Sequence, residues 1–255
     1  MASNFNKVWS FGCSFMYGTT IVEGDPEYVK DTIGWGAKIG EYLDKPAQNC
    51  AVSGYGNQQI LNEFFSNLPD IKPNDLVIVS WSSPLRYYWP QGPYGSINYM
   101  ANFDNLEIPT RLRTILELYR QRRLLYPDDI VLEQLDHILL IQETCKNRGI
   151  KVLQNNALVD VTLDIDIEQS TDWLLSRHLQ VDTQNFWCYN SGTLCNLLGI
   201  TSNTDPMGGG LNREDMDLSK DMMWSDSRVW HHPSIKGHDF ISKTLSEWIL
   251  SNDSY

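Results

Sequence analysis

Residues 75–81, with the sequence DLVIVSW, constrain the fold of this chain more than any other segment. Their apolar side chains follow one another almost without a break instead of alternating with polar ones. That pattern is typical of a strand buried on both faces, as in a parallel sheet that carries helices on each side. We therefore expect an α/β fold built around a parallel sheet.

The segments on either side alternate between strand-like and helix-like patterns. Further short runs rich in strand-forming residues occupy 7–11, 47–52 and 150–154. Apolar residues recur at helical spacing in 35–43, 58–68, 111–125, 130–148 and 234–250. The inward faces of three of these helices are expected to carry Trp35, Ile39, Tyr42 and Leu43, then Ile60, Leu61, Phe64 and Phe65, and finally Phe240, Ile241, Leu245 and Trp248. This order predicts a mostly parallel, flavodoxin-like sheet within a three-layer α/β/α sandwich.

Residues 157–228 interrupt the alternation. They contain scattered aromatic residues, many acidic residues and a flexible run of three glycines at 208–210. We interpret residues 1–255 as a single domain in which about 157–228 form a loop-rich insertion over the strand ends. Residues 86–110, rich in aromatics, Gly and Pro, are expected to form a loop as well.

Composition argues against several kinds of partner. The net charge of −12 repels phosphate backbones, so we expect no nucleic-acid partner. No run of about 18 apolar residues is present, which argues against a membrane span, and the polar start carries no secretory signal. The five cysteines form no close metal-type pair and indicate reduced thiols, Cys188 and Cys195 included, in a cytoplasmic protein. We predict no cofactor.

A serine and a histidine occupy positions suited to nucleophilic catalysis. Ser14, in FGCSF, follows the first strand at the start of a helix or loop, where main-chain N–H groups can stabilise an oxyanion. His232, in HHPSIKGH, precedes a proline that stiffens its turn. A fixed imidazole beside a serine is what nucleophile activation requires. Taken alone, Ser14 would be read as a turn or helix-cap residue.

Two further segments end strands at the edge where open α/β sheets bind ligands. Gly54, in NCAVSGYGN, lets a substrate approach the main chain, and its N–H can point at a developing negative charge. Ser82, in SWSSPLR, can add a side-chain donor to the same oxyanion. A plain glycine turn and a simple helix cap are the alternatives for these two residues.

Taken together and in this order, the four segments resemble the SGNH (GDSL-like) hydrolase superfamily over nearly the whole chain. FGCS resembles its GDS block, which implies that Ser14 is the nucleophile. NCAVSGYGN resembles its second block, which implies that Gly54 is an oxyanion donor beside the N–H of Ser14. SWSSPLR stands at the place of its GxND block, and HHPSIKGH resembles its closing block, which implies that His232 is the base. The third block is similar to that of SGNH-like proteins found in phage genomes.

Three positions depart from the family pattern. Cys13 replaces an Asp that is not a reacting group, and Ser82 replaces the oxyanion Asn. The acid that the family places three residues before the histidine is Val229 here. Asp226 is the nearest candidate for this role, and Asp221, Asp239 or a main-chain carbonyl are further possibilities.

The other histidines suggest no additional chemistry. His231, His232 and His238 are close in sequence, but their spacing runs across a turn into a helix, and no carboxylate or thiolate pair accompanies them. We therefore predict no metal site. His137 lies within a helical pattern and is expected to be structural or exposed.

The resemblance implies a serine hydrolase that cleaves a small-molecule or carbohydrate ester through an acyl-enzyme. Aromatic residues at 86–104 and 173–189 suit acyl groups or the sugar rings of O-acetyl carbohydrates, or they pack the insertion. A binding or structural protein that kept the fold and lost the chemistry, for example a virion component, is the alternative. An O-acyltransferase on the same scaffold is a third.

Overall fold

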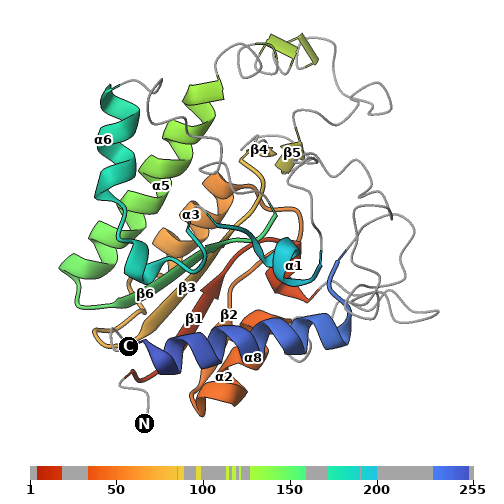
Figure 1. The fold of residues 1–255 in the computed structure, drawn as a ribbon, viewed down its shortest axis with the longest axis vertical. Helices are drawn as coiled ribbons and strands as arrows, with labels where there is room; N and C mark the ends of the chain where they lie inside the picture. The colour runs from red at the N-terminus through yellow and green to blue at the C-terminus, as the bar shows by residue number, and fades with distance from the viewer. Residues whose placement is uncertain are drawn as a thin grey trace.

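Four parallel strands form the central sheet of the computed structural model (Figure 1). The described residues are 5–18, 34–84, 86–88, 96–98, 113–114, 117–118, 121, 127–158, 172–189, 191–199 and 232–252. The sheet consists of β1 (Val8–Phe11), β2 (Ala47–Asn49), β3 (Leu76–Trp81) and β6 (Lys151–Asn156), in the order β2-β1-β3-β6. This confirms the expected parallel α/β sheet, although β2 ends at Asn49 and not at residue 52.

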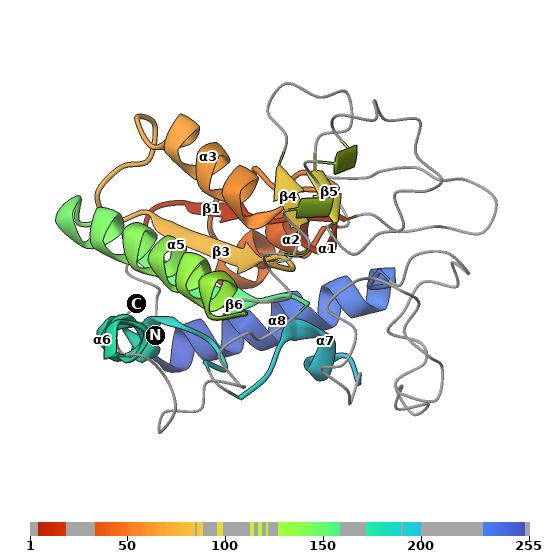
Figure 2. The ribbon, with the colours of Figure 1, turned by 90° about the horizontal axis from the view of Figure 1, so that it is seen from above.

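Helices cover both faces of the sheet, so the fold has the three expected layers (Figures 1 and 2). One face carries α2 (Trp35–Leu43) and α8 (Ile235–Ser251), and the other carries α3 (Asn57–Asn67) and α5 (Pro127–Asn147). Alternate strand residues point to each layer. Val8 and Ile78 therefore belong to the core under α2 and α8, whereas Phe11 and Val79 belong to the core under α3 and α5.

The helices present narrower inward faces than their sequence patterns suggest. Trp35, Ile39 and Leu43 of α2 are buried, as expected, but the fourth residue, Tyr42, is 39% exposed. On α3, Phe65 is likewise 37% exposed. Both residues lie at the margin of the apolar stripe, where one edge of a large ring remains in water.

Several short elements complete the fold. They are α1 (Ser14–Tyr17), β4 (Arg86–Tyr88), β5 (Ser96–Asn98), α6 (Asp172–Gln180), the 3₁₀ turn η2 (Thr183–Asn185) and α7 (Leu194–Leu197). The antiparallel β4–β5 pair was expected to be loop, as was α6. Within the expected helix 111–125, the described residues are helical.

The expected insertion is described at 157–158, 172–189 and 191–199, and its residues 186–187 pack onto the edge of the sheet. Phe186 forms a parallel bridge with Gln154 of β6, and the N–H of Trp187 donates to the Gln154 carbonyl at 2.8 Å. Phe186 and Trp187 are 2% and 8% exposed. Burial of these two rings extends the core beyond β6. The sequence pattern predicts a loop-rich insertion here and does not indicate this extension.

The closing helix α8 is hydrogen-bonded to the main chain of α2. The N–H of Trp35 donates to Nδ1 of His238 at 3.3 Å, and the hydroxyl of Ser242 donates to the carbonyl of Trp35 at 3.3 Å. All three residues are fully buried. The hydroxyl of Ser10 in β1 donates to the carbonyl of Gly36, which ties α2 to the sheet. The start of α8 is thereby aligned with the end of β1.

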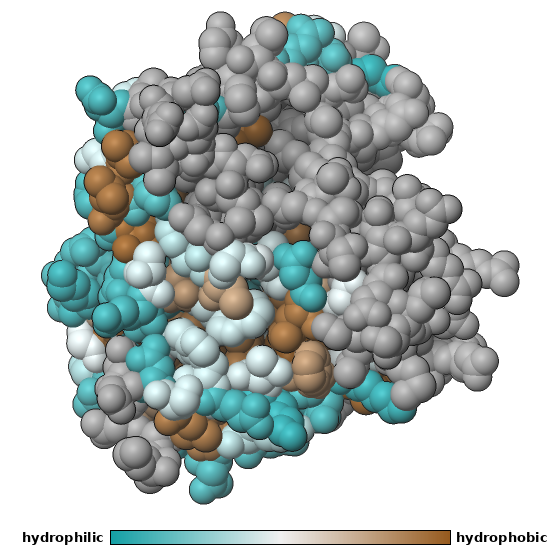
Figure 3. All heavy atoms as spheres, viewed as in Figure 1, coloured by the Kyte–Doolittle hydropathy of each residue, from teal (hydrophilic) through white to brown (hydrophobic). Residues whose placement is uncertain are grey.

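The visible surface is chemically mixed. On the face in Figure 3, hydrophobic patches are small and separated by hydrophilic ones. No helix in the described part of the chain is long and apolar enough to cross a membrane. All five cysteines lie in described segments, and none of them forms a disulfide.

Acid should weaken the fold through His238. Nδ1 accepts a hydrogen bond from Trp35, so the neutral ring carries its proton on Nε2. The pKa of His238 is lowered to about 3. Burial is the main cause, and the positive charges of His232 and Lys38 add to it. In the unfolded chain a histidine has a pKa of about 6.5. As the pH falls from about 6.5 toward 3, only the unfolded chain binds this proton, and the free energy of unfolding drops by about 1.4 kcal/mol per pH unit.

Urea unfolding of the native chain and of His238→Gln at pH 7, 6, 5 and 4 measures this effect. The variant loses the Trp35 bond and is less stable at pH 7, by about 1 kcal/mol. The difference should then shrink as the pH falls, because glutamine does not titrate. Parallel pH profiles for the two proteins would show that His238 does not carry the effect.

Candidate active site

Ser14 and His232 meet at the carboxyl end of the sheet. Nε2 of His232 lies 2.8 Å from Oγ of Ser14, although the residues are 218 positions apart in the sequence. Ser14 is 6% exposed and His232 is half-buried. This is the distance and pairing that a general base needs to take a proton from a nucleophilic hydroxyl.

The backbone turns sharply between β1 and α1 to present Ser14. Cys13 is extended, with φ −97° and ψ −162°, and its carbonyl accepts the N–H groups of Met16 and Tyr17. Cys13 itself is fully buried in the core, so its side chain is removed from the reacting atoms. The N–H of Ser14, at the start of the turn, has no acceptor among the described residues. It is therefore available to an oxyanion.

The position of His232 follows from the start of α8. Pro233 restricts the residue before it to extended conformations, which keeps His232 outside the helix. Ser234 is the N-cap, and its hydroxyl accepts the N–H of Gly237 at 3.1 Å. Because α8 is held on α2 by Trp35, the capped turn has a fixed place relative to Ser14.

Gly54 lies in a turn beside the nucleophile segment. The N–H of Val52 donates to the carbonyl of Gly12 at 3.1 Å, which joins this turn to the residues just before Ser14. Gly54 has φ +84°, a left-handed conformation that favours glycine. No atom lies within 4 Å of where its Cβ would be. Its N–H has no acceptor within the described segments, as for Ser14.

Ser82 has a different arrangement from the other two expected oxyanion donors. Its N–H donates to Oδ1 of Asn57 at 2.8 Å, so the main-chain donor is already occupied. Its hydroxyl is buried and has no hydrogen-bond partner among the residues that the structure describes. The β1–β3 ladder ends with Phe11 beside Val79, and the chain runs on from this end of the sheet to Ser14 and to Ser82. A buried hydroxyl without a partner requires an explanation, and a catalytic role is one such explanation.

The candidates for the acid that would orient His232 divide into two groups. Asp226 and Asp221, together with Val229, lie outside the described residues. Asp239 is described, and its Oδ1 accepts from Nζ of Lys38 and from the hydroxyl of Tyr42, both at 2.9 Å. The bond from Lys38 is the main reason that the pKa of Asp239 is lowered. Asp239 thus serves the α2–α8 contact.

Polar residues that sequence reasoning missed connect the strand ends to α5. The indole of Trp81 donates to Oε1 of Gln154 at 2.8 Å, and Nε2 of Gln154 donates to the carbonyl of Ile138 at 3.1 Å. His137, expected to be structural or exposed, is 8% exposed and stacks on Trp81 with the ring centroids 6.0 Å apart. Nearer Ser14, the guanidinium of Arg86 donates to the carbonyl of Tyr55 at 3.2 Å.

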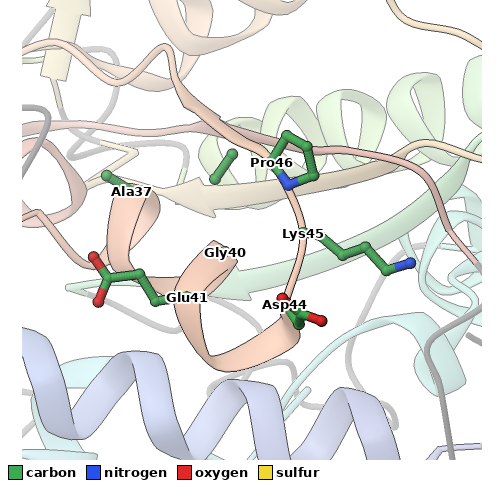
Figure 4. A pocket seen from close by; sticks show the side chains of 7 residues that line it. Ala37, Gly40, Glu41, Asp44, Lys45 and Pro46 are labelled. Atoms are coloured by element: carbon green, nitrogen blue, oxygen red, sulfur yellow. The ribbon is translucent and has the colours of Figure 1, made fainter.

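A surface hollow lies at the opposite end of the sheet (Figure 4). It has a volume of about 380 Å³ and is lined by Ala37, Gly40, Glu41, Asp44, Lys45, Pro46 and Ala47. Ala47 pairs with Val8 at the amino ends of the parallel strands, whereas Ser14 follows the carboxyl end of β1. In Figure 4, Glu41 and Lys45 point in opposite directions and do not converge on a common ligand. Across the described segments, no three His, Cys, Asp or Glu side chains group closely enough to hold a metal ion.

The sequence matches no protein-family model and no curated protein. Solved structures are similar along almost the whole chain. A protein from Desulfitobacterium hafniense DCB-2, described as lipolytic and of the G-D-S-L family, is 15% identical over 95% of this chain and 99% of that one, with a TM-score of 0.47. A lipase/acylhydrolase from Enterococcus faecalis is 9% identical over 96% of this chain and 95% of that one, with a TM-score of 0.44.

A third similar structure is that of a carbohydrate esterase whose active site is described as having divergent catalytic and non-catalytic binding functions. It is 14% identical over 97% of this chain and 69% of that one, with a TM-score of 0.46. All three are likenesses of overall architecture between distant sequences. They assign no role to an individual residue of this chain.

Proposed function

We propose that this protein is a serine hydrolase that cleaves an ester through an acyl-enzyme on Ser14. The observation that carries the proposal is the 2.8 Å contact between Nε2 of His232 and Oγ of Ser14. The N–H groups of Ser14 and Gly54, which have no acceptor among the described residues, support it, because main-chain donors near a nucleophile suit a tetrahedral oxyanion. The resemblance of the four sequence segments to SGNH hydrolases agrees with this chemistry.

In the proposed reaction, Oγ of Ser14 attacks the ester carbonyl while Nε2 of His232 accepts the hydroxyl proton. The N–H groups of Ser14 and Gly54 hold the oxyanion. The C–O bond to the alcohol then breaks, and His232 returns the proton to the leaving alkoxide. A water molecule, deprotonated by His232, then attacks the acyl carbonyl; the bond from the acyl carbon to Oγ breaks, the carboxylic acid leaves, and His232 returns the proton to Ser14. The hydroxyl of Ser82 serves as a third donor once substrate binding uncovers it, since it is buried without a partner in the free protein.

The proposed substrates are small-molecule acyl esters or O-acetyl carbohydrates. Aromatic side chains next to the site would stack on a sugar ring or an acyl group. Phe186 and Trp187 do not have this role, because both are buried in the core. We propose that the aromatic residues of 86–104 take this role; residues 89–95 and 99–104 lie outside the described part of the chain.

Labelling with a fluorophosphonate tests the proposal directly. The native chain should gain one phosphonyl group, and Ser14→Ala and His232→Ala should remain unlabelled, because the reaction needs an activated hydroxyl. Each variant should also lower kcat for ester hydrolysis about 10⁴-fold or more. Labelling is read by intact mass.

Absence of labelling in a native chain shown to be folded by circular dichroism would contradict catalysis. The chain would then be a binding or structural protein that keeps the fold. Labelling that persists in Ser14→Ala would place the nucleophile elsewhere.

We further propose that Asp226 orients His232. It is the nearest acidic residue before the histidine, and Asp239 is engaged by Lys38. Replacing Asp226 with Asn should lower kcat by about 10³- to 10⁴-fold, as loss of a triad carboxylate does in serine proteases. Asp221→Asn is the matched control and should change kcat less than about threefold. If both variants keep the native kcat, neither carboxylate orients His232, and a main-chain carbonyl is the orienting group.

Gly54→Ala should reduce catalysis by straining the oxyanion turn. The new Cβ meets no atom within 4 Å, so its only cost is the left-handed φ of +84°, roughly 1–2 kcal/mol. Relief of that strain turns the N–H away from the oxyanion, and kcat should fall about 10²-fold.

Gly149→Ala provides the control for this experiment. Gly149 also has a left-handed φ, +66°, and its Cβ would have only ordinary contact with Pro73 at 3.8 Å. It lies at the amino end of β6, away from Ser14. The two variants should lose similar stability in urea, while Gly149→Ala keeps its kcat. A similar fall in kcat for both would indicate a general effect of strain on the fold.

A further inference from the structure

Asn57, the first residue of α3, joins the Gly54 turn to the end of β3. Its Oδ1 accepts the N–H of Ser82 at 2.8 Å, and its Nδ2 donates to the carbonyl of Ser82 at 3.3 Å. The amide thus pairs with both main-chain groups of one residue, as a neighbouring strand would. Asn57 is 4% exposed and Ser82 is 1% exposed, so the pairing is shielded from water.

A second buried amide supports Asn57 from α5. Nδ2 of Asn57 also donates to Oε1 of Gln134 at 2.5 Å, and Gln134 is 3% exposed. Nε2 of Gln134 is buried and has no partner within the described segments. Its contact therefore restricts the orientation of the Asn57 amide and contributes little else.

The turn that contains Gly54 is attached on three sides. The N–H of Val52 bonds to Gly12 before it, the carbonyl of Tyr55 accepts from Arg86 beside it, and Asn57 bonds to Ser82 after it. Gly54 itself makes no hydrogen bond to any residue in the described part of the chain. The direction of its N–H is consequently set by the neighbouring attachments, of which the Asn57–Ser82 pair is the most buried.

We propose that Asn57 is a positioning residue of the oxyanion site. Its paired bonds set the separation between the Gly54 turn and Ser82, so that the N–H of Gly54 and the hydroxyl of Ser82 face the same carbonyl oxygen. This inference rests on the proposed esterase function. Donors that stabilise only the transition state act on kcat, so loss of Asn57 lowers kcat and leaves KM nearly unchanged.

Asn57→Ala tests the proposal with 4-nitrophenyl acetate as substrate. A shift of about 1 Å in a catalytic group costs about 10²-fold in rate, and we expect a fall of that size in kcat with KM changed less than about threefold. Gln134→Met keeps the pairing of Asn57 with Ser82 and removes only its support, so a smaller fall, about threefold to tenfold, is expected. The Gln134 variant decides the question if Asn57→Ala does not fold.

The chain contains a matched control for a purely structural amide. Gln142 of α5, 6% exposed, also pairs with both main-chain groups of one residue, the N–H and the carbonyl of Asp182, each at 3.1 Å. Gln142→Ala should lose stability comparable to Asn57→Ala and retain the native kcat.

The outcomes separate the two proposals. A native chain that hydrolyses the ester, with kcat unchanged in Asn57→Ala and in Gln134→Met, overturns the role of Asn57 alone. A rise in KM without a fall in kcat also overturns it, because it would make Asn57 a binding residue. A folded native chain that neither hydrolyses the ester nor reacts with a fluorophosphonate overturns the proposed function and this inference with it.

Discussion

The docking of α8 on α2 is the constraint on which the candidate site depends. Ser14 follows the first strand and His232 precedes the last helix, so only tertiary packing brings them to 2.8 Å. The buried bond from Trp35 to His238 sets the position of α8, and Ser10 holds α2 to β1, the strand that precedes Ser14. One short series of contacts therefore leads from the nucleophile to its base. A small displacement of α8 against α2 should therefore alter the distance between Ser14 and His232 before it weakens the sheet.

The carboxyl edge of the sheet separates occupied polar groups from available ones. The side-chain amides of Asn57 and Gln154 satisfy the ends of β3 and tie them to α5. The N–H groups of Ser14 and Gly54 remain without acceptors in the described part of the molecule. A donor that bonds to no protein acceptor is preorganised, because it need not break a protein contact to receive charge.

The hydrophobic pattern was enough to predict the layers of the fold. It also predicted that Ser14 and Gly54 follow strands and that His232 precedes the last helix. It failed where a residue acts through partners distant in sequence. Asn57 would be read from sequence only as a residue near a helix start, because its bonding to Ser82 exists only once α3 lies beside β3. Phe186 was assigned to an insertion, since no local signal indicates that it would extend the sheet at Gln154.

The central claim is that an acyl group passes through Ser14. Acid quenching of the native chain during turnover of a slowly hydrolysed acyl ester, followed by peptide mass mapping, tests this claim most directly. We expect an acyl adduct confined to the peptide that contains Ser14, formed in the native chain and missing in His232→Ala. Ester turnover without an adduct, or an adduct on another residue, would contradict it.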